Sequence, residues 1–169
     1  MSRKVRHMAK VYLFCGKICS GKTWYAEKIR KSASAVILSG DEVTYDLTDN
    51  QLGEEYDAFA KRVNGYLRKK AAQIVQAGVN VILDWGFWTR AVRMEISEFF
   101  RTRGISYEWY YMDVSDEQWE KNIAERNSRI ERGEGGYDFY VDEGLLGKVT
   151  SLFEIPRKEE IDVWIRPQR

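Results

Sequence analysis

The residues best suited to chemistry lie in one short stretch near the start of the chain. It runs from Gly16 to Thr23 and matches the pattern G-x-x-x-x-G-K-[ST]. Such a loop follows a buried strand, turns at its glycines so that backbone N–H groups point inward, and opens a helix with a partly positive N-terminus. These features favour the binding of nucleotide phosphates. We expect the contacts to come from Gly16, Lys17, Ile18, Cys19, Ser20, Gly21, Lys22 and Thr23.

Two side chains of this loop predict the use of ATP with Mg²⁺. Lys22 has the length to reach the β- and γ-phosphates, and the hydroxyl of Thr23 can ligate Mg²⁺. A second magnesium residue is expected at Asp84, which ends the strand-like run 79–84. An acid in that place ligates the metal or holds one of its waters, and a plain turn residue is the alternative.

A further acid is a candidate general base. The short apolar run 35–38 ends in Ser39-Gly40-Asp41-Glu42. In open α/β sheets, ligands bind in the crevice at the carboxyl ends of the strands, and an acid placed there faces that crevice. We therefore predict that Asp41 accepts the proton of an acceptor hydroxyl. Glu42 is the nearest competitor for this role, and a helix cap is the alternative role for Asp41.

The segment after the candidate base is acidic and aromatic. Residues 41–60 hold seven carboxylates and no lysine or arginine, with Tyr45 among the interleaved aromatic residues. Trp85, Phe87 and Trp88 follow the later strand and either line a substrate pocket or belong to the core. Because carboxylates attract cations and aromatic faces stack on rings, we expect a polar or cationic, ring-bearing substrate. Its contacts would come from Asp41, Glu42, Tyr45, Asp84 and Trp85.

A second group of basic residues precedes a glycine-rich stretch. Arg126 and Arg129 lie at the end of a predicted helix that opens into residues 133–136, of which three are glycine. This arrangement is typical of a lid that closes over a nucleotide. The alternative is an ordinary solvated helix face. We predict a lid over about residues 126–141, with Arg126 and Arg129 as catalytic residues and Arg126 also in contact with the nucleotide. Arg132 is a further candidate for that contact.

The elements that must position these residues alternate along the chain. Strands are predicted over residues 11–15, 35–38, 79–84, 105–112 and 161–165. Helices are predicted over residues 22–31, 56–77, 90–103, 116–131 and 141–153, with Thr89 and Ser115 as caps. Such alternation implies a parallel sheet covered by helices on both faces, in one α/β domain. We expect that domain over residues 10–169 and a flexible arm over residues 1–9.

The composition indicates which binding partners and which cellular compartment to expect. The chain has 169 residues and a net charge of +1, so it offers no general reason to bind nucleic acid or an anionic membrane. The sequence contains no apolar run of about 18 residues, so it predicts no membrane-spanning helix. Cys15 and Cys19 both belong to the phosphate-binding stretch, and a disulfide there would distort it, which favours a reduced, cytoplasmic protein. The two thiols are expected to be small fillers of a tight loop, with a redox-sensitive switch as the alternative.

At this point the chain resembles a known group of enzymes. It is similar to the small P-loop kinases that include the kinase half of phage polynucleotide kinase, chloramphenicol phosphotransferase and the zeta toxins. The residues that carry the likeness are 16–23, Ser39-Gly40-Asp41-Glu42, Asp84 followed by Arg93, the arginines Arg126 and Arg129, and Phe153-Glu154-Ile155-Pro156.

The resemblance implies a fold and a set of roles. The fold is a three-layer P-loop NTPase domain whose five-stranded parallel sheet has the order 2-3-1-4-5. By resemblance, Asp41 accepts the proton of the acceptor, Arg126 and Arg129 neutralise the transferring phosphate, and Arg93 lies at the substrate side. The polynucleotide kinases carry an arginine shortly after their catalytic aspartate, whereas Glu42-Val43-Thr44-Tyr45 follow here, so nucleic-acid ends are a poorer fit.

Three functions remain at this stage. The leading one is an ATP-dependent kinase that phosphorylates a hydroxyl of a small, polar or cationic molecule. Within the same class, the alternatives are a 5′-hydroxyl polynucleotide or nucleotide kinase and a zeta-type toxin acting on a nucleotide-sugar. From a different class comes a non-catalytic switch that moves its lid on binding ATP. The guanine-specific N-K-x-D motif is absent from Arg126-Asn127-Ser128-Arg129, which favours ATP.

Overall fold

The computed structural model describes residues 8–49 and 51–167. Of the arm predicted over residues 1–9, residues 1–7 therefore lie outside the described part. The division into an arm and a single domain stays a prediction. Within the described ranges, no helix has the length and apolar character needed to cross a membrane.

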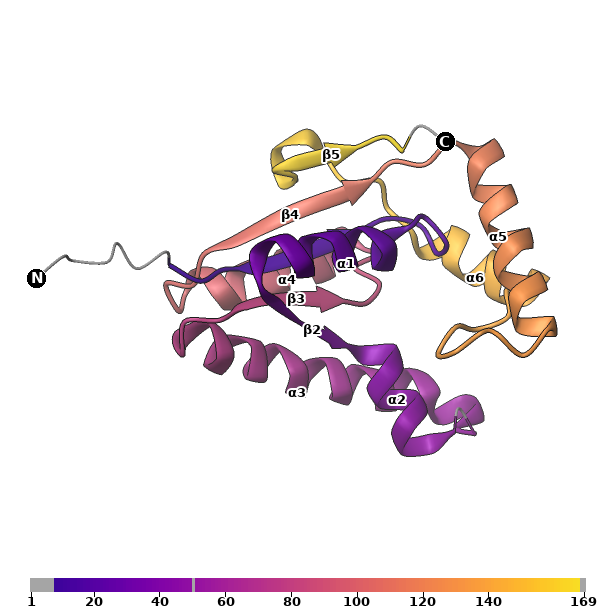
Figure 1. The fold of residues 1–169 in the computed structure, drawn as a ribbon, viewed down its shortest axis with the longest axis horizontal. Coiled ribbons are helices and arrows are strands. Elements are labelled where there is room, and N and C mark those ends of the chain that lie inside the picture. Colours follow the sequence, from indigo (N-terminus) through magenta and orange to yellow (C-terminus); the bar gives the residue numbers. More distant parts are fainter. Residues whose placement is uncertain (1–7, 50, 168–169) are drawn as a thin grey trace, which may run out of the picture.

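The described residues form one parallel sheet at the centre of the molecule (Figure 1). Its five strands have the order β2-β3-β1-β4-β5, which confirms the predicted topology. The paired strands run parallel throughout. Their bounds are β1 (Val11–Cys15), β2 (Ala35–Ser39), β3 (Asn80–Asp84), β4 (Tyr107–Met112) and β5 (Val163–Ile165).

Helices cover both faces of this sheet. They are α1 (Lys22–Ala33), α2 (Gly40–Thr48), α3 (Tyr56–Gln76), α4 (Arg90–Arg101), α5 (Asp116–Glu131) and α6 (Glu143–Leu152). Successive side chains of a strand point to opposite faces of the sheet, so β1 contributes residues to two hydrophobic cores, one on each face. Leu13 packs in the cluster that contains α3 and α4, whereas Phe14 packs in the cluster that contains α1.

The register of the sheet brings two of the predicted site segments together. Ser39, the last residue of β2, pairs with Asp84, the last residue of β3. The acid that follows β2 and the acid that ends β3 therefore meet at one edge of the sheet. The pairing of β2 with β3 brings these two acids together although they are far apart in the sequence.

Several helix starts follow from short polar side chains. Thr89 and Ser115 cap α4 and α5 as predicted, their hydroxyls accepting from the backbone N–H groups of Val92 and Gln118. Helix α2 was not predicted, because residues 41–60 carry little helical periodicity. Its cap is Ser39, whose hydroxyl accepts from Glu42 N at 3.3 Å, so Asp41 is not the cap.

Two element boundaries near the C-terminus differ from expectation. The last helix begins at Glu143 and not at residue 141, because Asp142 caps it by accepting from Leu145 N at 2.7 Å. The last strand is shorter than predicted and spans Val163–Ile165. A capping carboxylate sets a helix start more sharply than apolar spacing does.

Candidate active site

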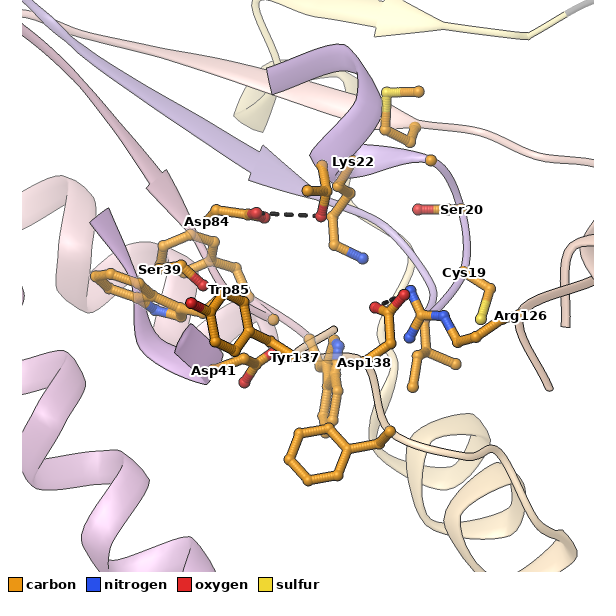
Figure 2. A pocket seen from close by; sticks show the side chains of 18 of the residues that line it. Cys19, Ser20, Lys22, Ser39, Asp41, Asp84, Trp85, Arg126, Tyr137 and Asp138 are labelled. Carbon is orange, nitrogen blue, oxygen red and sulfur yellow. Dashed lines mark hydrogen bonds and ion pairs between the residues drawn. The ribbon is translucent and has the colours of Figure 1, made fainter. Parts of the chain in front are cut away.

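A large cavity lies at the carboxyl ends of the strands. It has a volume of about 1560 Å³ and is lined by the phosphate-binding loop, by both candidate acids and by the predicted lid. Figure 2 shows Asp41, Ser39 and Trp85 on one side of this space and Cys19 and Arg126 on the other. Residues that are far apart in the sequence thus line the same cavity.

Close packing at the first glycine shapes the loop. A Cβ atom at Gly16 would lie 2.7 Å from Ser20 Oγ and 3.0 Å from the backbone oxygen of Met112, so only glycine fits. Cys19 has a φ of 57°, an uncommon backbone conformation for a residue with a side chain. Such strain is often held at ligand-binding loops by the surrounding structure.

Polar atoms of the loop fit a bound phosphate chain. The hydroxyl oxygen of Ser20 is buried and has no hydrogen-bond partner among the described residues. Lys22 Nζ donates back to the loop itself, to Lys17 O at 2.7 Å and to Gly16 O at 3.1 Å. Burial lowers the pKa of Lys22, and the nearby Asp84 opposes that shift. Phosphate oxygens would satisfy both donors and supply the missing negative charge.

The predicted magnesium residues touch each other. Thr23 Oγ1 donates to Asp84 Oδ2 at 3.1 Å. Mg²⁺ usually keeps several water ligands, so it needs only a few ligands from the protein and the nucleotide. One hydroxyl, one carboxylate and the phosphates of a nucleotide would be sufficient. This pair would hold the ion, which would supply charge neutralisation at the transferring phosphate.

Both acids of the cavity have raised pKa values, and the charge of Asp84 contributes to the shift of Asp41. Desolvation raises the pKa of Asp41, the charge of Asp84 raises it further, and Lys22 acts in the opposite direction. Desolvation also raises the pKa of Asp84, against the effect of Lys22. The hydroxyl of Tyr56 donates to Asp41 Oδ1 at 3.4 Å. A carboxyl with a raised pKa in a cavity is suited to proton transfer.

Helix α5 holds the phosphate-binding loop from behind. Trp119 Nε1 donates to Ile18 O at 2.6 Å, and Asn122 Nδ2 donates to Cys19 O at 2.8 Å. Lys17 points towards this helix, 2.7 Å from Asp116 and over the ring of Trp119. Its side chain therefore serves the scaffold, and only its backbone belongs to the phosphate cradle. Sequence reasoning missed Trp119 and Asn122, since no local pattern marks them.

The lid arginines share one acidic partner. Asp138 lies 3.3 Å from Arg126 Nη2 and 2.6 Å from Arg129 Nη2. Figure 2 shows Asp138 beside Arg126 at the cavity. A carboxylate thus occupies the arginines that were predicted to meet a phosphate. Asp138 was not identified from the sequence, where it is one acid among many.

The loop of the predicted lid is held at its far end and near its middle. Asn127 clamps its far end, donating to Val141 O at 2.9 Å and accepting from Val141 N at 2.8 Å. Near the middle of the loop, Tyr137 contacts Tyr45 of α2 edge to face, with 5.4 Å between ring centroids. A second such contact, also 5.4 Å, joins Phe139 to Tyr56. The loop after α5 therefore reaches across to α2 (Figure 1).

One predicted substrate residue is placed elsewhere by the structure. Arg93 is 2% exposed and lies outside the cavity lining. Its Nε donates to Glu160 at 2.9 Å, and Nη1 donates to the backbone oxygens of Phe87, Trp88 and Glu154 at 3.1 to 3.2 Å. The substrate role is corrected here, because this guanidinium joins the loop after β3 to the C-terminal segment.

The other candidates divide between the cavity wall and the surface. Glu42 and Tyr45 are exposed on α2 and lie outside the lining. Trp85 lines the cavity, yet it is 7% exposed and packs on Phe87 at 5.2 Å between ring centroids. It therefore combines the two roles that the sequence left open, as a core residue whose surface forms part of the wall.

The wall on the acceptor side is not purely acidic. Lys61 and Arg68 of α3 and Lys148 of α6 also line the cavity. Arg68 forms an ion pair with Glu95, and Lys148 lies 2.8 Å from Asp57. The acidic composition of residues 41–60 did not reveal these cations, because they come from other parts of the chain.

The sheet order and the phosphate-binding loop define the class of protein: this is a P-loop kinase fold. A family model described as an AAA domain matches residues 11–154, and the chain belongs to that family. Among solved structures, it is similar to the Mycobacterium tuberculosis APS kinase CysC in complex with AMPPNP and APS. The TM-score is 0.69 at 17% identity, covering 96% of this chain and 90% of that one.

Two further proteins are similar to the chain. A gluconokinase from Sinorhizobium meliloti 1021 matches with a TM-score of 0.67 at 14% identity, over 95% of this chain and 83% of that one. At such identities the likeness shows the fold alone. A protein named Protein KTI12 homolog, from Arabidopsis thaliana, is 30% identical over 154 residues, or 86% of this chain. The chain spans 47% of the length of that relative.

Proposed function

We propose that this protein transfers the γ-phosphate of ATP to a hydroxyl group of a small molecule. The observation that carries the proposal is one shared cavity. It joins Lys22, the contacting pair Thr23 and Asp84, and the candidate base Asp41 to the lid arginines. Phosphoryl transfer needs mainly positioning and positive charge, and these residues supply both.

The residues suggest a simple sequence of events. The acceptor hydroxyl gives its proton to the carboxylate of Asp41 as its oxygen forms a bond to the γ-phosphorus. The bond between that phosphorus and the bridging oxygen breaks, and ADP leaves with the electron pair. Lys22 and Arg126 neutralise the charge on the transferring group. Both lid arginines first exchange Asp138 for phosphate oxygens.

The acceptor side supports a polar substrate with a ring. Trp85 and Trp88 offer aromatic surface, and Tyr56 and Asp57 offer polar groups in the same part of the wall. Aromatic faces bind rings and cations, and carboxylates attract positively charged groups. The two solved proteins to which the chain is similar are an APS kinase and a gluconokinase, and both names are consistent with a small acceptor in this fold.

One observation favours a second candidate function. The cations Lys61, Arg68 and Lys148 in the acceptor wall are what a phosphate backbone would need for compensation. A 5′-hydroxyl oligonucleotide is therefore the alternative acceptor. Both Arg68 and Lys148 are already paired with carboxylates, which reduces the positive charge that they offer.

Another observation favours a non-catalytic switch. The lid arginines have an internal partner, Asp138, and a nucleotide would be a competing one. Two alternative sets of partners are the basis of a two-state element. In such a protein, nucleotide binding would rearrange the lid, and Asp41 would matter little.

The experiment uses γ-labelled ATP, Mg²⁺ and three groups of acceptors. These are nucleosides, 5′-hydroxyl oligonucleotides, and hydroxylated small molecules that include aminoglycosides and sugars. Label on a small molecule supports the leading proposal, and label on oligonucleotides alone supports the second. Tight ATP binding without transfer to any acceptor would contradict both and favour the switch.

A further inference from the structure

The cavity has two ends, which differ in their chemistry. Asp41 lies on the side of β2 and β3, at one flank of the phosphate-binding loop. On the other flank, at the ends of β4 and β5, the lining contains Val114, Ile165 and Pro167. If the γ-phosphate faces Asp41, as the proposed function requires, the nucleoside extends towards the apolar flank. The inference below rests on that function.

Two amide side chains stand beside this apolar flank. Gln118 and Asn122 of α5 both line the cavity. They form a chain of hydrogen bonds to the phosphate-binding loop: Gln118 Nε2 donates to Asn122 Oδ1 at 2.8 Å, and Asn122 Nδ2 donates to Cys19 O at 2.8 Å.

The direction of this chain is set by its last member. A backbone carbonyl only accepts, so the NH₂ group of Asn122 must face Cys19. The oxygen of Asn122 then faces Gln118 and requires a donor, which is the NH₂ group of Gln118. This leaves Oε1 of Gln118 as an acceptor available to a ligand, beside the second N–H of its NH₂ group.

Gln118 is not used in the way that its position on the helix suggests. It lies three residues after the cap Ser115, where a glutamine side chain often accepts from the N–H of the cap residue. Among residues 8–49 and 51–167, Oε1 of Gln118 has no hydrogen-bond partner, and its NH₂ group is directed along the helix to Asn122. The side chain is half-buried at the cavity wall.

We propose that Gln118 sets the preference for adenine over guanine in the bound nucleotide. The group at position 6 of the base is an amino donor in adenine and a carbonyl acceptor in guanine. An orientation-locked acceptor pairs with the first and repels the second. The apolar flank formed by Val114, Ile165 and Pro167 would pack against the ring, so Gln118 acts as a specificity-determining residue and takes no part in phosphate transfer.

The test compares equilibrium binding of ATP and GTP, with Mg²⁺ and without acceptor. The wild-type protein is expected to bind ATP at least about tenfold more tightly than GTP. In Gln118→Ala the ratio should fall towards one. In Gln118→Arg it should reverse, because a guanidinium donates to the guanine oxygen. Gln76→Arg, the same change at an exposed position on α3, is the matched control and should keep the wild-type ratio.

The outcomes separate this inference from the proposed function. A wild-type preference for ATP that disappears only in the Gln118 variants supports the inference. Equal binding of ATP and GTP by the wild type, or a preference that survives both Gln118 variants, overturns it and leaves the kinase proposal intact. Binding of neither nucleotide by the folded protein overturns both. Circular dichroism of each variant establishes that it is folded.

Discussion

The two flanks of the cavity are built in different ways. The flank that would hold the phosphate donor is one continuous segment, residues 16–23, fastened to α5 by Trp119 and Asn122. The acceptor flank is assembled from the start of α2, the first half of α3, the loop after β3 and part of α6. The first flank therefore offers general phosphate chemistry from a local motif, whereas the second gathers side chains whose combination can differ from protein to protein.

Charge distinguishes the flanks as well. On the donor flank, the cations have partners within the protein: Lys22 donates hydrogen bonds to loop carbonyls, and Arg126 and Arg129 form ion pairs with Asp138. On the acceptor flank, Asp41 and Asp84 have raised pKa values, first because they are desolvated. In the proposed function, the donor flank is suited to an anion and the acceptor flank is suited to proton transfer. Four experiments test this division.

The largest effect is expected from Arg126→Ala. It removes a positive charge that would meet the transferring phosphate, and such arginines contribute about 10³- to 10⁵-fold to the rate. The measurement is single-turnover transfer of the γ-label to the best acceptor. The matched control is Arg132→Ala, an exposed arginine six residues further on that lies outside the cavity lining and pairs with Glu134. Equal losses in the two variants would contradict the role given to Arg126.

The next largest effect is expected from Asp41→Asn, on the acceptor flank. Removal of the general base should slow transfer by about 10²- to 10⁴-fold, while ATP binding stays unchanged or becomes tighter. Asp49→Asn at the end of α2 is the control, because asparagine tolerates the left-handed backbone that Asp49 adopts there. If Asp41→Asn transferred phosphate at the wild-type rate, the acceptor flank would need another base.

Asp138→Asn tests the internal partner of the lid arginines. The variant frees Arg126 and Arg129 from a competing carboxylate, so ATP affinity should rise by about three- to tenfold, a modest gain because these ion pairs are partly exposed. Equilibrium binding of ATP at low salt measures the change. Glu134→Gln in the same loop is the control. A weaker affinity in Asp138→Asn would mean that Asp138 helps to build the site.

The smallest effect concerns stability as a function of pH. The pKa of Asp41 is raised above its ordinary value of 3.8, so the folded state binds its proton more tightly than the unfolded state does. This contribution is fully present below the unfolded pKa and is lost as pH rises through the folded pKa. Asp84 behaves in the same way. Urea unfolding at a series of pH values should therefore show a shallower loss of stability with rising pH in Asp41→Asn than in the wild type. An unchanged slope would contradict the raised pKa.

Local sequence patterns determined the donor flank. The strand before Gly16, the glycines and the Lys22-Thr23 pair specify their own conformation and chemistry within a few residues, so the loop was predicted residue by residue. Asp41 and Asp84 were found for a related reason: both follow a strand, and the carboxyl ends of parallel strands meet at one edge. Their common cavity is a consequence of that rule.

Only the tertiary structure decided which charged side chains face the cavity. Arg93 follows β3 in the sequence just as a substrate residue would, yet its guanidinium is directed into a buried network with Glu160, 67 residues further along the chain. Lys61, Arg68 and Asp138 enter the wall from segments that carry no motif. Side chains on a helix point outward in all directions around its axis. For α4, contacts with remote segments decide which of them face the cavity and which are buried elsewhere. The sequence by itself therefore determined the place of the proposed phosphate chemistry, and the packing of distant segments decided which partners the candidate reacting groups have.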